Sequence, residues 1–458
     1  MKTDYDLVVI GAGAAGLVAA GMSAILGAKT ALIEHHLLGG DCTWTGCVPS
    51  KTLLHAARLT HQIRAAARIG IRATPEVDFP AVMSHVRAIR QQIYYDADAP
   101  PNFERLGIEV VSARARFLDP HTLDLTGAAP RRITARWIVI ATGSRPRLPD
   151  SPADVLTNET IFDLNDLPRR LLVMGAGPIG IEMAQAFRRL GSAVTVNGSS
   201  REILPRDDPE LATLLRESLE REGIQFQLRR KLDPAPGDYD AILAAIGRTP
   251  DIAGLDLPRA GVEATSNGIR VDRHCRTTAR HIYATGDVTG QFQFTHMAEH
   301  MSKVAVSNAL LHWPRSVDAR HAVWCTYTDP EFAQLGAPAS KDSSVFRFPF
   351  RRLDRAITEG ETTGVVKVSA DRRGRILGAT ILGPHAGELI SEYALAMKNG
   401  LTLSDISNTI HPYPTYMLAN RRAADAWDLR KLTPTTLRAL RFVFRLRGST
   451  KSATHLEI

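Results

Sequence analysis

Two cysteines separated by four residues have the clearest capacity for chemistry in this sequence. Cys42 and Cys47 lie in the run GGDCTWTGCVPSK, which ends at Lys51. A cysteine reacts as its thiolate, and both a helix N-terminus and a nearby lysine stabilise that form. A metal knuckle would need a second closely spaced cysteine pair, and the sequence has none. The spacing therefore predicts a redox-active disulfide, with two buried, unreactive thiols as the alternative.

A glycine-rich turn near the N-terminus predicts a dinucleotide site. The apolar run 5–10 is followed by Gly11, Gly13 and Gly16, then by a small-residue helical stretch and a second apolar run that ends at Glu34. The glycines allow a tight turn and let a pyrophosphate approach the backbone N–H groups at the start of a helix. Glu34 is placed to accept hydrogen bonds from a ribose hydroxyl.

The same pattern recurs about 160 residues later. The run LLVM (171–174) precedes Gly175, Gly177 and Gly180, and a helical stretch and the strand-like run SAVTV follow. Two such units in one chain predict two bound dinucleotides. The obvious pair is a flavin and a nicotinamide.

The end of the second unit favours NADPH over NADH. No acid ends its second strand, and Ser199, Ser200 and Arg201 stand there instead. A carboxylate would repel a 2′-phosphate, whereas two hydroxyls and a guanidinium can bind one. Gly180 weakens this preference, because NADPH sites often carry alanine at the third glycine. The alternative is that this loop is only polar and exposed.

The cysteine motif and several others resemble one known family. The GGDCTWTGCVPSK run is similar to the redox centre of class I pyridine nucleotide–disulfide oxidoreductases, and the resemblance covers roughly residues 4–428. The further matches, in the expected order, are ATGSRP (141–146), GAGPIGIE (175–182), AIGRTP (245–250), YATGD (283–287) and THMA (295–298).

The resemblance implies a role for each matching residue. Cys42 would be the interchange thiol that meets substrate, and Cys47 would form the charge-transfer thiolate against the flavin. Lys51 and Glu182 would pair near the flavin N5. The implied FAD and nucleotide contacts further include Gly40, Thr142, Gly143, Gly247, Arg248, Asp287 at the ribityl or phosphate region, and Thr295 at the isoalloxazine edge.

The expected fold is α/β, with two Rossmann-like dinucleotide-binding domains and a C-terminal α+β dimerisation domain. The expected FAD-binding domain is residues 1–147 and 269–320, and the expected NAD(P)H-binding domain is residues 148–268. Residues 321–428 contain strand-like segments (VFRFPF, GVVKVSA and RILGATILG) before a helix from about 388 to 399, which predicts an antiparallel sheet covered by helices. In the resembling family this module forms a homodimer.

One stretch departs from the disulfide-reducing relatives. Those proteins carry a His-Pro motif with a glutamate five residues after the histidine, and this pair moves protons to the interchange thiol. In HPYPTYML, alignment on Pro-Thr puts Tyr413 at the histidine position and Leu418 at the glutamate position. A shifted alignment would promote His411, whose fifth follower is Tyr416. Neither alignment restores the pair.

Tyrosine at this position is similar to mercuric reductases, where the acceptor is a thiol-bound metal ion. Two of their hallmarks are missing, an N-terminal metal-binding domain and a vicinal cysteine pair near the C-terminus. Cys275 and Cys325 are isolated and are expected to be small buried hydrophobic residues. No resident metal site is predicted.

Composition limits the remaining classes of function. The 458 residues are 44% hydrophobic and 23% charged, and only four are cysteine, which predicts a globular protein without a disulfide scaffold. Residues 429–458 hold seven basic residues and one acid, so this tail carries most of the net charge of +8. The remaining charge is too small to predict nucleic-acid binding. Lacking a secretory signal, the protein is expected in the cytoplasm.

The basic tail predicts a cationic amphipathic helix. Thr433-Pro434 resembles a helix start, after which leucine, valine and phenylalanine share one face and arginines gather on the other. Such a helix (433–447) either docks on the dimer or lies on anionic lipid at the inner membrane surface.

The sequence therefore predicts a flavoenzyme that passes hydride from NADPH through FAD to the Cys42–Cys47 disulfide. The final acceptor would be thiol-reactive, such as a soft metal ion like Hg(II). One alternative is dihydrolipoamide dehydrogenase or another small-disulfide reductase. The other is a membrane-surface redox sensor or electron-donor flavoprotein.

Overall fold

The computed structural model describes residues 3–150, 155–230, 237–337, 339 and 343–448. It divides into two compact units, one of residues 1–199 with 224–318 and one of residues 200–223 with 319–458. Residues 449–458 of the predicted tail, with Lys451 and Glu457, lie outside the described residues.

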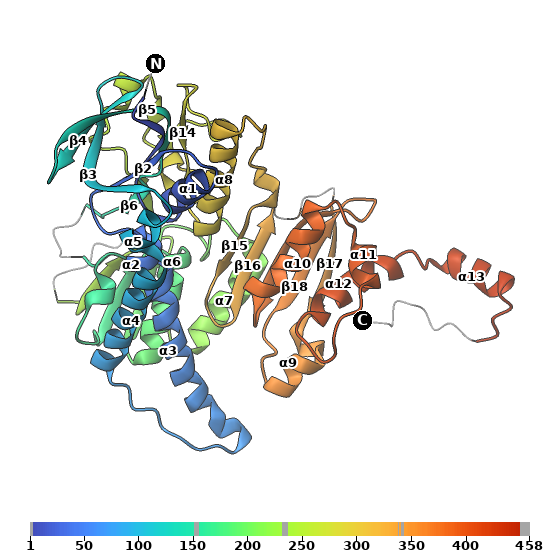
Figure 1. Ribbon diagram of the computed structural model, residues 1–458. Coiled ribbons are helices and arrows are strands. Elements are labelled where there is room, and N and C mark those ends of the chain that lie inside the picture. Colours follow the sequence, from blue (N-terminus) through green and yellow to red (C-terminus); the bar gives the residue numbers. More distant parts are fainter. Residues whose placement is uncertain (1–2, 151–154, 231–236, 338, 340–342, 449–458) are drawn as a thin grey trace. The chain divides into compact units, whose positions relative to one another are not determined.

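The first unit is built on a mixed sheet (Figure 1). Strands β14 (Ile282–Ala284), β5 (Arg131–Ile140), β1 (Tyr5–Ile10), β2 (Thr30–Glu34) and β3 (Glu109–Phe117) pair in this order as parallel neighbours. Strand β4 (Thr122–Gly127) pairs antiparallel with β3 and with the first half of β5. The late strand β14 therefore completes a sheet that the N-terminus begins.

The central strand β1 is buried on both faces, as a parallel strand covered by other layers must be. Leu7 and Val9 join the apolar cluster that contains helix α1 (Ala14–Ile25) and helix α8 (Thr295–Leu310), while Val8 and Ile10 join the cluster on the other face. Alanines on α1 let it lie close against α8. This packing fixes the start of α1 directly above the C-terminal edge of β1.

A second, four-stranded parallel sheet lies in the same unit. Its order is β10 (Ala241–Ala244), β7 (Arg170–Met174), β8 (Ala193–Gly198) and β9 (Gln225–Leu228). Helix α6 (Pro178–Leu190) follows β7. A short antiparallel pair, β6 (Ser144–Pro146) and β11 (Arg248–Pro250), brings the ATGSRP and AIGRTP motifs together.

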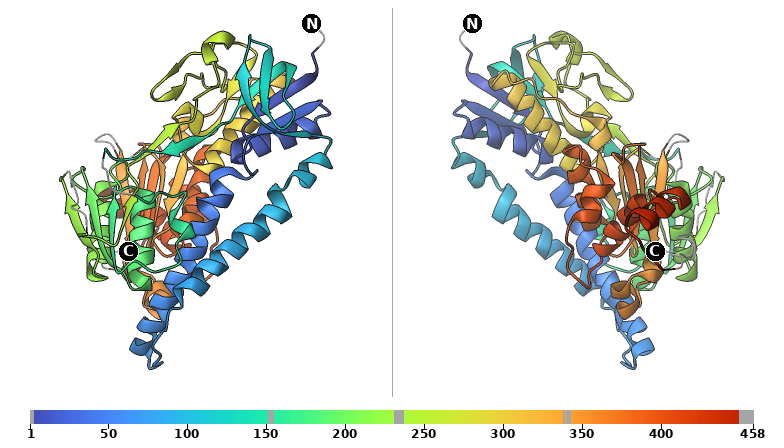
Figure 2. Two further views of the ribbon diagram at one scale, coloured as in Figure 1. Left: turned by 90° about the vertical axis from the view of Figure 1, so that its left-hand side faces the viewer. Right: turned by 90° about the vertical axis from the view of Figure 1, so that its right-hand side faces the viewer.

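Two long helices carry the redox motif and its support. After the short α2 (Gly40–Trp44), helix α3 (Cys47–Ala65) runs beside α4 (Phe79–Ile93) (Figure 2). The π-helical turn η2 (Tyr94–Asp98), which continues α4, and α5 (Pro100–Glu104) then lead back to β3. Helix α3 also packs against α6. The redox motif is thereby joined to the second glycine-rich unit.

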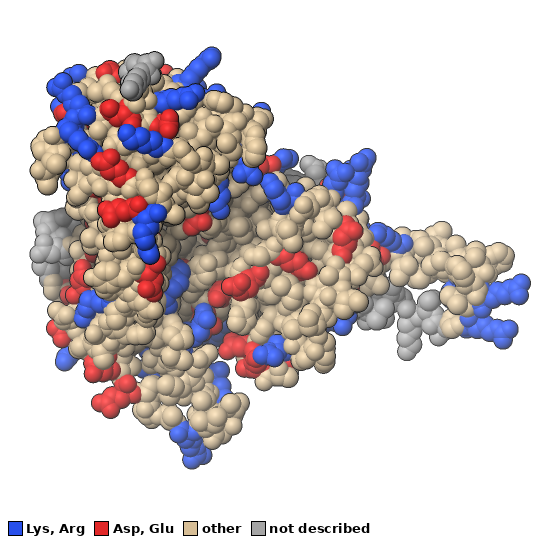
Figure 3. All heavy atoms as spheres, in the orientation of Figure 1, with Lys and Arg blue, Asp and Glu red and all other residues tan. Residues whose placement is uncertain are grey.

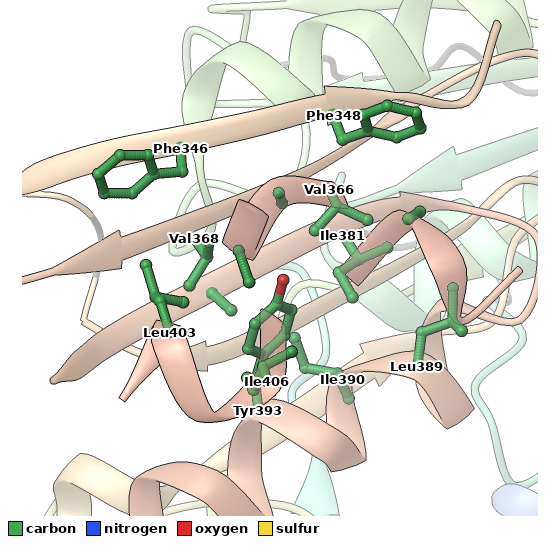
Figure 4. Packing of buried hydrophobic residues seen from close by; sticks show 14 of the residues in the cluster. Phe346, Phe348, Val366, Val368, Ile381, Leu389, Ile390, Tyr393, Leu403 and Ile406 are labelled. Carbon is green, nitrogen blue, oxygen red and sulfur yellow. The ribbon is translucent and has the colours of Figure 1, made fainter. Parts of the chain in front are cut away.

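The second unit contains the predicted antiparallel sheet, with two more strands than the sequence indicated. Its order is β15 (Val323–Thr326), β16 (Glu331–Gly336), β19 (Ile376–Gly383), β18 (Val365–Ala370) and β17 (Ser344–Pro349). Helix α10 (Ala386–Lys398) supplies Ile390 and Tyr393 to the core of this unit, and α11 (Leu403–Asn408) supplies Leu403 (Figure 4). Helix α12 (Leu418–Leu429) adds Trp427 to the same core. The predicted α/β fold with a C-terminal α+β module is confirmed.

Helix α7 (Pro209–Arg221) belongs to the second unit, although its residues fall inside the predicted range 148–268. Charge pairs hold its start: Lys367 contacts Asp208 at 2.5 Å and Glu210 at 3.0 Å, and Arg347 binds Glu210 through both terminal nitrogens. A compact unit and a family domain are different divisions of the chain, so the predicted domain boundaries stay predictions.

Candidate active site

The two motif cysteines lie at the start of a helix and form an unequal pair. Cys47 is the first residue of α3, and Cys42 lies in the preceding α2. The Thr295 hydroxyl, at the first turn of α8, lies 3.3 Å from the Cys47 sulfur. Two helix N-termini therefore meet at Cys47, where their partial positive charge favours a thiolate.

Proton affinities separate the two thiols. A hydrogen bond from the Cys42 thiol lowers the pKa of Cys47 to about 6, and the Thr295 hydroxyl and the Lys51 ammonium act in the same direction against the effect of burial. The same hydrogen bond raises the pKa of Cys42 well above its ordinary value. At neutral pH the reduced pair therefore holds its proton on Cys42 and its negative charge on Cys47.

Lys51 and Glu182 come together from the two packed helices α3 and α6. The Lys51 ammonium lies 2.8 Å from a Glu182 oxygen, and Glu182 is buried. A buried carboxylate needs such a partner, because an unpaired charge away from water is costly. The pair places a fixed cation one turn from Cys47.

A second polar cluster surrounds Arg248. Its guanidinium donates to the Ser144 hydroxyl at 2.7 Å and the Asn158 side-chain oxygen at 3.1 Å, and it also binds Asp41. Ser144 in turn donates to Asp287 at 2.7 Å, and burial raises the pKa of Asp287. Since Asp41 precedes Cys42, this cluster links the redox motif to the ATGSRP, AIGRTP and YATGD motifs.

Sequence reasoning missed several members of these clusters. Asn158 also donates to Thr45, between the two cysteines, and Thr43 donates to Asp98 at 2.5 Å. Burial raises the pKa of Asp98, which lies 55 residues away in η2. No pattern at fixed spacing could reveal Asn158 or Asp98, because only the fold brings them to the motif.

The two glycine-rich turns have the form that the sequence predicted. Gly11 has a φ of +99°, and a Cβ on Gly16 would overlap the Gly11 carbonyl oxygen, so neither position accepts a larger residue. Gly175 and Gly180 repeat this contact in the second turn. A Cβ on Gly40 would lie 2.7 Å from the Gly13 Cα, which shows how closely the redox motif approaches the first turn.

Both turns present donors suited to a pyrophosphate. Helices α1 and α6 begin after Gly13 and Gly177, and no side chain caps either helix. The first N–H groups of an α-helix lack partners inside the helix and favour an anion. These residues therefore fit the two dinucleotides.

The ribose ends of the two units differ. In the first, Glu34 ends β2 and accepts a hydrogen bond from the Ala12 N–H at 2.9 Å. The first glycine of each turn donates its N–H to a carbonyl of the second strand, Gly11 to Ile33 and Gly175 to Asn197, so Ile33 and Asn197 are equivalent. The residue after each is then also equivalent, and Gly198 therefore stands where the first unit has Glu34. Asn197 is buried and donates to the carbonyls of Gln227 and Arg230, so it does not replace the missing acid.

The remaining residues predicted to bind the two nucleotides lie in both units of the structure. Thr142 donates to the Asp251 carbonyl at 2.6 Å, and Gly143 and Gly247 have φ values of +73° and +115° at the ends of the β6–β11 pair. Ser199 is exposed just after β8. Ser200 and Arg201 belong to the second unit, where Arg201 is exposed.

Tyr413 also belongs to the second unit. Its side chain is 71% exposed, and its hydroxyl donates to Asp354 at 3.0 Å, which raises the pKa of the tyrosine. Leu418 is buried in the core of that unit. At the position where relatives have glutamate, this chain therefore has an apolar side chain in apolar surroundings.

The second unit nevertheless contains an imidazole–carboxylate pair. The buried His411 ring lies 2.8 Å from Glu392 through Nε2 and 2.8 Å from the Thr409 carbonyl through Nδ1. Asn420 donates to the other Glu392 oxygen at 3.0 Å. The family motif places the carboxylate five residues after the histidine, whereas Glu392 lies on α10, 19 residues before His411. The motif therefore could not identify Glu392 as the partner.

The remaining cysteines and histidines form no metal centre in the part of the chain that the structure describes, which holds no group of three or more potential metal ligands. Cys275 is buried, as expected, and burial raises its pKa to about 12. The expectation of burial is wrong for Cys325, which is only half-buried at the edge of the second core. His296, which belongs to the THMA motif, and His300 are an exposed pair four residues apart on α8.

Replacing Thr295 by valine is expected to raise the pKa of Cys47 by about 1, because the thiolate loses a hydrogen bond to a charged acceptor. The measurement is the ultraviolet absorbance of the thiolate across pH in a Cys42→Ser background, which leaves one thiol of the pair. Thr52→Val is the control, since that hydroxyl donates to the Val48 carbonyl. An unchanged titration in Thr295→Val would show that this hydroxyl does not stabilise the thiolate.

Comparisons with known proteins agree with this arrangement. Residues 5–302 match the pyridine nucleotide-disulphide oxidoreductase family, and residues 322–424 match the dimerisation domain of that family. Dihydrolipoyl dehydrogenase from Chlamydia muridarum is 35% identical over 91% of this chain and 95% of its own length. Mercuric reductase from Lysinibacillus sphaericus is 33% identical over 93% of this chain and 83% of its own length.

Solved structures show the same relationship. The Cu(II) complex of the HOCl-induced flavoprotein disulfide reductase RclA from Escherichia coli is 27% identical, with a TM-score of 0.82 over 93% of this chain and 100% of its own. LpdA from Mycobacterium tuberculosis is 28% identical, with a TM-score of 0.86 over 92% of this chain and 99% of its own. The chain therefore belongs to the pyridine nucleotide-disulphide oxidoreductase family, whose flavin-dependent disulfide chemistry its paired cysteines are built to perform.

Proposed function

We propose that this protein uses NADPH to reduce the Cys42–Cys47 disulfide and that the reduced pair then reduces a soft, thiol-binding acceptor such as Hg(II) or Cu(II). The observation that carries the proposal is the division of the reduced pair into a Cys42 thiol and a Cys47 thiolate, together with Tyr413 and Leu418 in place of an acid–base pair. Bound FAD supplies the two-electron relay between nicotinamide and disulfide.

The chain's own residues would hold and direct the reactants. Uncapped N–H groups of α1 and α6 bind the two pyrophosphates, Lys51 with Glu182 supplies a fixed charge, and Thr295 stabilises the Cys47 thiolate. The hydride that NADPH provides would convert the disulfide into the Cys42 thiol and the Cys47 thiolate, without a proton from solvent. When this pair gives two electrons to one Hg(II), or one electron to each of two Cu(II), the S–S bond forms again and one proton leaves.

The acceptor preference follows from proton handling. When a disulfide substrate is cleaved, the departing thiolate needs a proton, and a positioned acid typically contributes about 10²–10⁴-fold to such a step. A metal ion held by thiolates needs no proton to accept electrons. The Cu(II) complex of RclA and the mercuric reductase relatives agree with this class of acceptor.

A small-disulfide reductase, such as a dihydrolipoamide dehydrogenase, is the second candidate. The dihydrolipoyl dehydrogenase relatives favour it, and so does the His411–Glu392 pair, because an imidazole held by a carboxylate can donate a proton. The dimerisation domain supports a homodimer for either function.

The decisive experiment is steady-state NADPH oxidation, under anaerobic conditions, with Hg(II), Cu(II), glutathione disulfide, lipoamide and quinones as acceptors. A separate aerobic arm measures oxygen as the acceptor. The proposal requires turnover with a soft metal ion and slow turnover with both disulfides. Fast lipoamide reduction without metal turnover would replace it by the second candidate.

NADPH is expected to exceed NADH in kcat/KM, because Gly198 removes the carboxylate that would repel a 2′-phosphate. Arg201→Ala should narrow the difference by about 1.5–3 kcal/mol, the free energy of a charge-assisted hydrogen bond. Arg221→Ala, at another exposed arginine of the same unit, is the control. Equal use of both nucleotides by the native protein would contradict the prediction.

A further inference from the structure

The C-terminal helix presents apolar side chains that the rest of the described chain does not cover. Helix α13 (Pro434–Val443) contains no buried residue, and it lies away from α11 and α12 of its own unit (Figure 1). Phe442, Val443 and Phe444 are 87%, 66% and 65% exposed. Large aromatic side chains normally bury most of their surface, so this segment is suited to a partner.

The helix itself is well formed at its start. The Thr433 hydroxyl caps it by accepting a hydrogen bond from the Thr436 N–H at 3.1 Å, and Pro434 occupies the first turn. These are ordinary signals for a helix N-terminus. Phe442 and Val443 therefore belong to a defined helical surface, and Phe444 follows them directly as the C-cap residue.

The arginines of α13 lie on one side of the helix. The predicted helical stretch 433–447 is shorter in the structure, because α13 ends at Val443 and Arg445 has a φ of +51°. At 100° per residue, Arg438 and Arg441 lie about 60° apart, while apolar residues cover most of the remaining circumference. The stretch 432–448 contains four arginines and no acidic residue. Basic side chains gather at the far end of this helix in the space-filling view (Figure 3).

We propose that α13 binds the surface of an anionic lipid bilayer. The apolar side would enter the boundary between headgroups and acyl chains, and the arginines would bind headgroup phosphates through their forked N–H groups. Their long aliphatic stems let the charges reach the phosphates while the helix axis lies lower. A second copy of this chain matches the helix less well, because the chain itself carries a net charge of +8 and would repel the arginines.

Such binding would be peripheral. No helix in the part of the chain that the structure describes is long and apolar enough to cross a membrane. The proposal is independent of the acceptor, since it depends on residues outside the redox motif.

The test is flotation of the full-length holoprotein with vesicles of phosphatidylcholine alone or with phosphatidylglycerol added. We expect binding to the anionic vesicles that weakens as salt is raised. Arg438→Glu with Arg441→Glu should weaken it by about 100-fold or more, and Phe442→Ser with Phe444→Ser by about tenfold or more. The matched controls are Arg68→Glu with Arg72→Glu and Ile25→Ser, at exposed positions of the first unit, which should bind like the native protein.

NADPH oxidation and sedimentation are measured on every variant. Unchanged turnover and oligomeric state in the tail variants, with lost flotation, would support the proposal. Equal binding to neutral vesicles, or no flotation of the native protein, would overturn it. If the native protein does not bind lipid and the tail variants self-associate more weakly than it does, then α13 contacts the partner subunit instead.

Discussion

Cys47→Ser is expected to lower acceptor reduction by at least about 10³-fold, because a serine hydroxyl can neither form the disulfide nor carry the thiolate charge. The bound flavin should be retained, since the glycine-rich turns and the Arg248 cluster are untouched. Steady-state NADPH oxidation measures the loss, and the flavin absorbance of the purified variant reports retention.

Cys42→Ser should abolish turnover equally but differ in its spectrum. It leaves the Cys47 thiolate in place, so a long-wavelength band from a thiolate beside the flavin should appear without reductant. In the reduced native protein the band should grow as pH rises through about 6, the pKa of Cys47, because the thiolate replaces the thiol. Cys47→Ser should lack the band at every pH, and a band that persists there would contradict the assignment of the two thiols.

Tyr413→His is expected to raise the reduction of small disulfides by up to about 10²–10⁴-fold, because it restores an imidazole at the position that relatives use for proton transfer. The single substitution is the sharper test. Leu418 is buried in the core of the second unit, so adding Leu418→Glu would bury a carboxylate and destabilise the fold. The measurement is kcat/KM for lipoamide and glutathione disulfide.

Tyr413→Phe is the matched control, because it keeps the ring and removes the hydroxyl bonded to Asp354. This variant should reduce metal ions more slowly if the Tyr413 hydroxyl forms a hydrogen bond with the bound ligand. The rate of metal-ion reduction should be unchanged if the hydroxyl has no such role. Efficient disulfide reduction by the native protein would mean that another group supplies the proton. His411→Gln should then remove that activity, since His411 is paired with Glu392.

Local sequence was enough to predict the parts of the site that lie within a few residues of one another. The glycine turns, the placement of Cys47 at a helix start and the capped start of α13 depend on backbone sterics and on partners within about five residues. The α/β class followed from the order of apolar runs and turns. Strand β15 was not predicted because its four residues give too weak a period, and β16 was not predicted because it is buried on both faces and shows no alternation of apolar and polar residues.

Tertiary structure alone decided which distant groups act on the cysteines. Asp98 meets Thr43, and Arg248 joins Asp41 to Ser144, only because η2 and the β6–β11 pair fold back on the redox motif. The resemblance implied the Lys51–Glu182 pair, but its 2.8 Å contact required α3 to pack on α6. The His411–Glu392 pair likewise depends on how α10 lies beside the loop before α12. Proton affinities vary with distances of a few ångströms and with burial, and a linear sequence specifies these only through the packing of the whole chain.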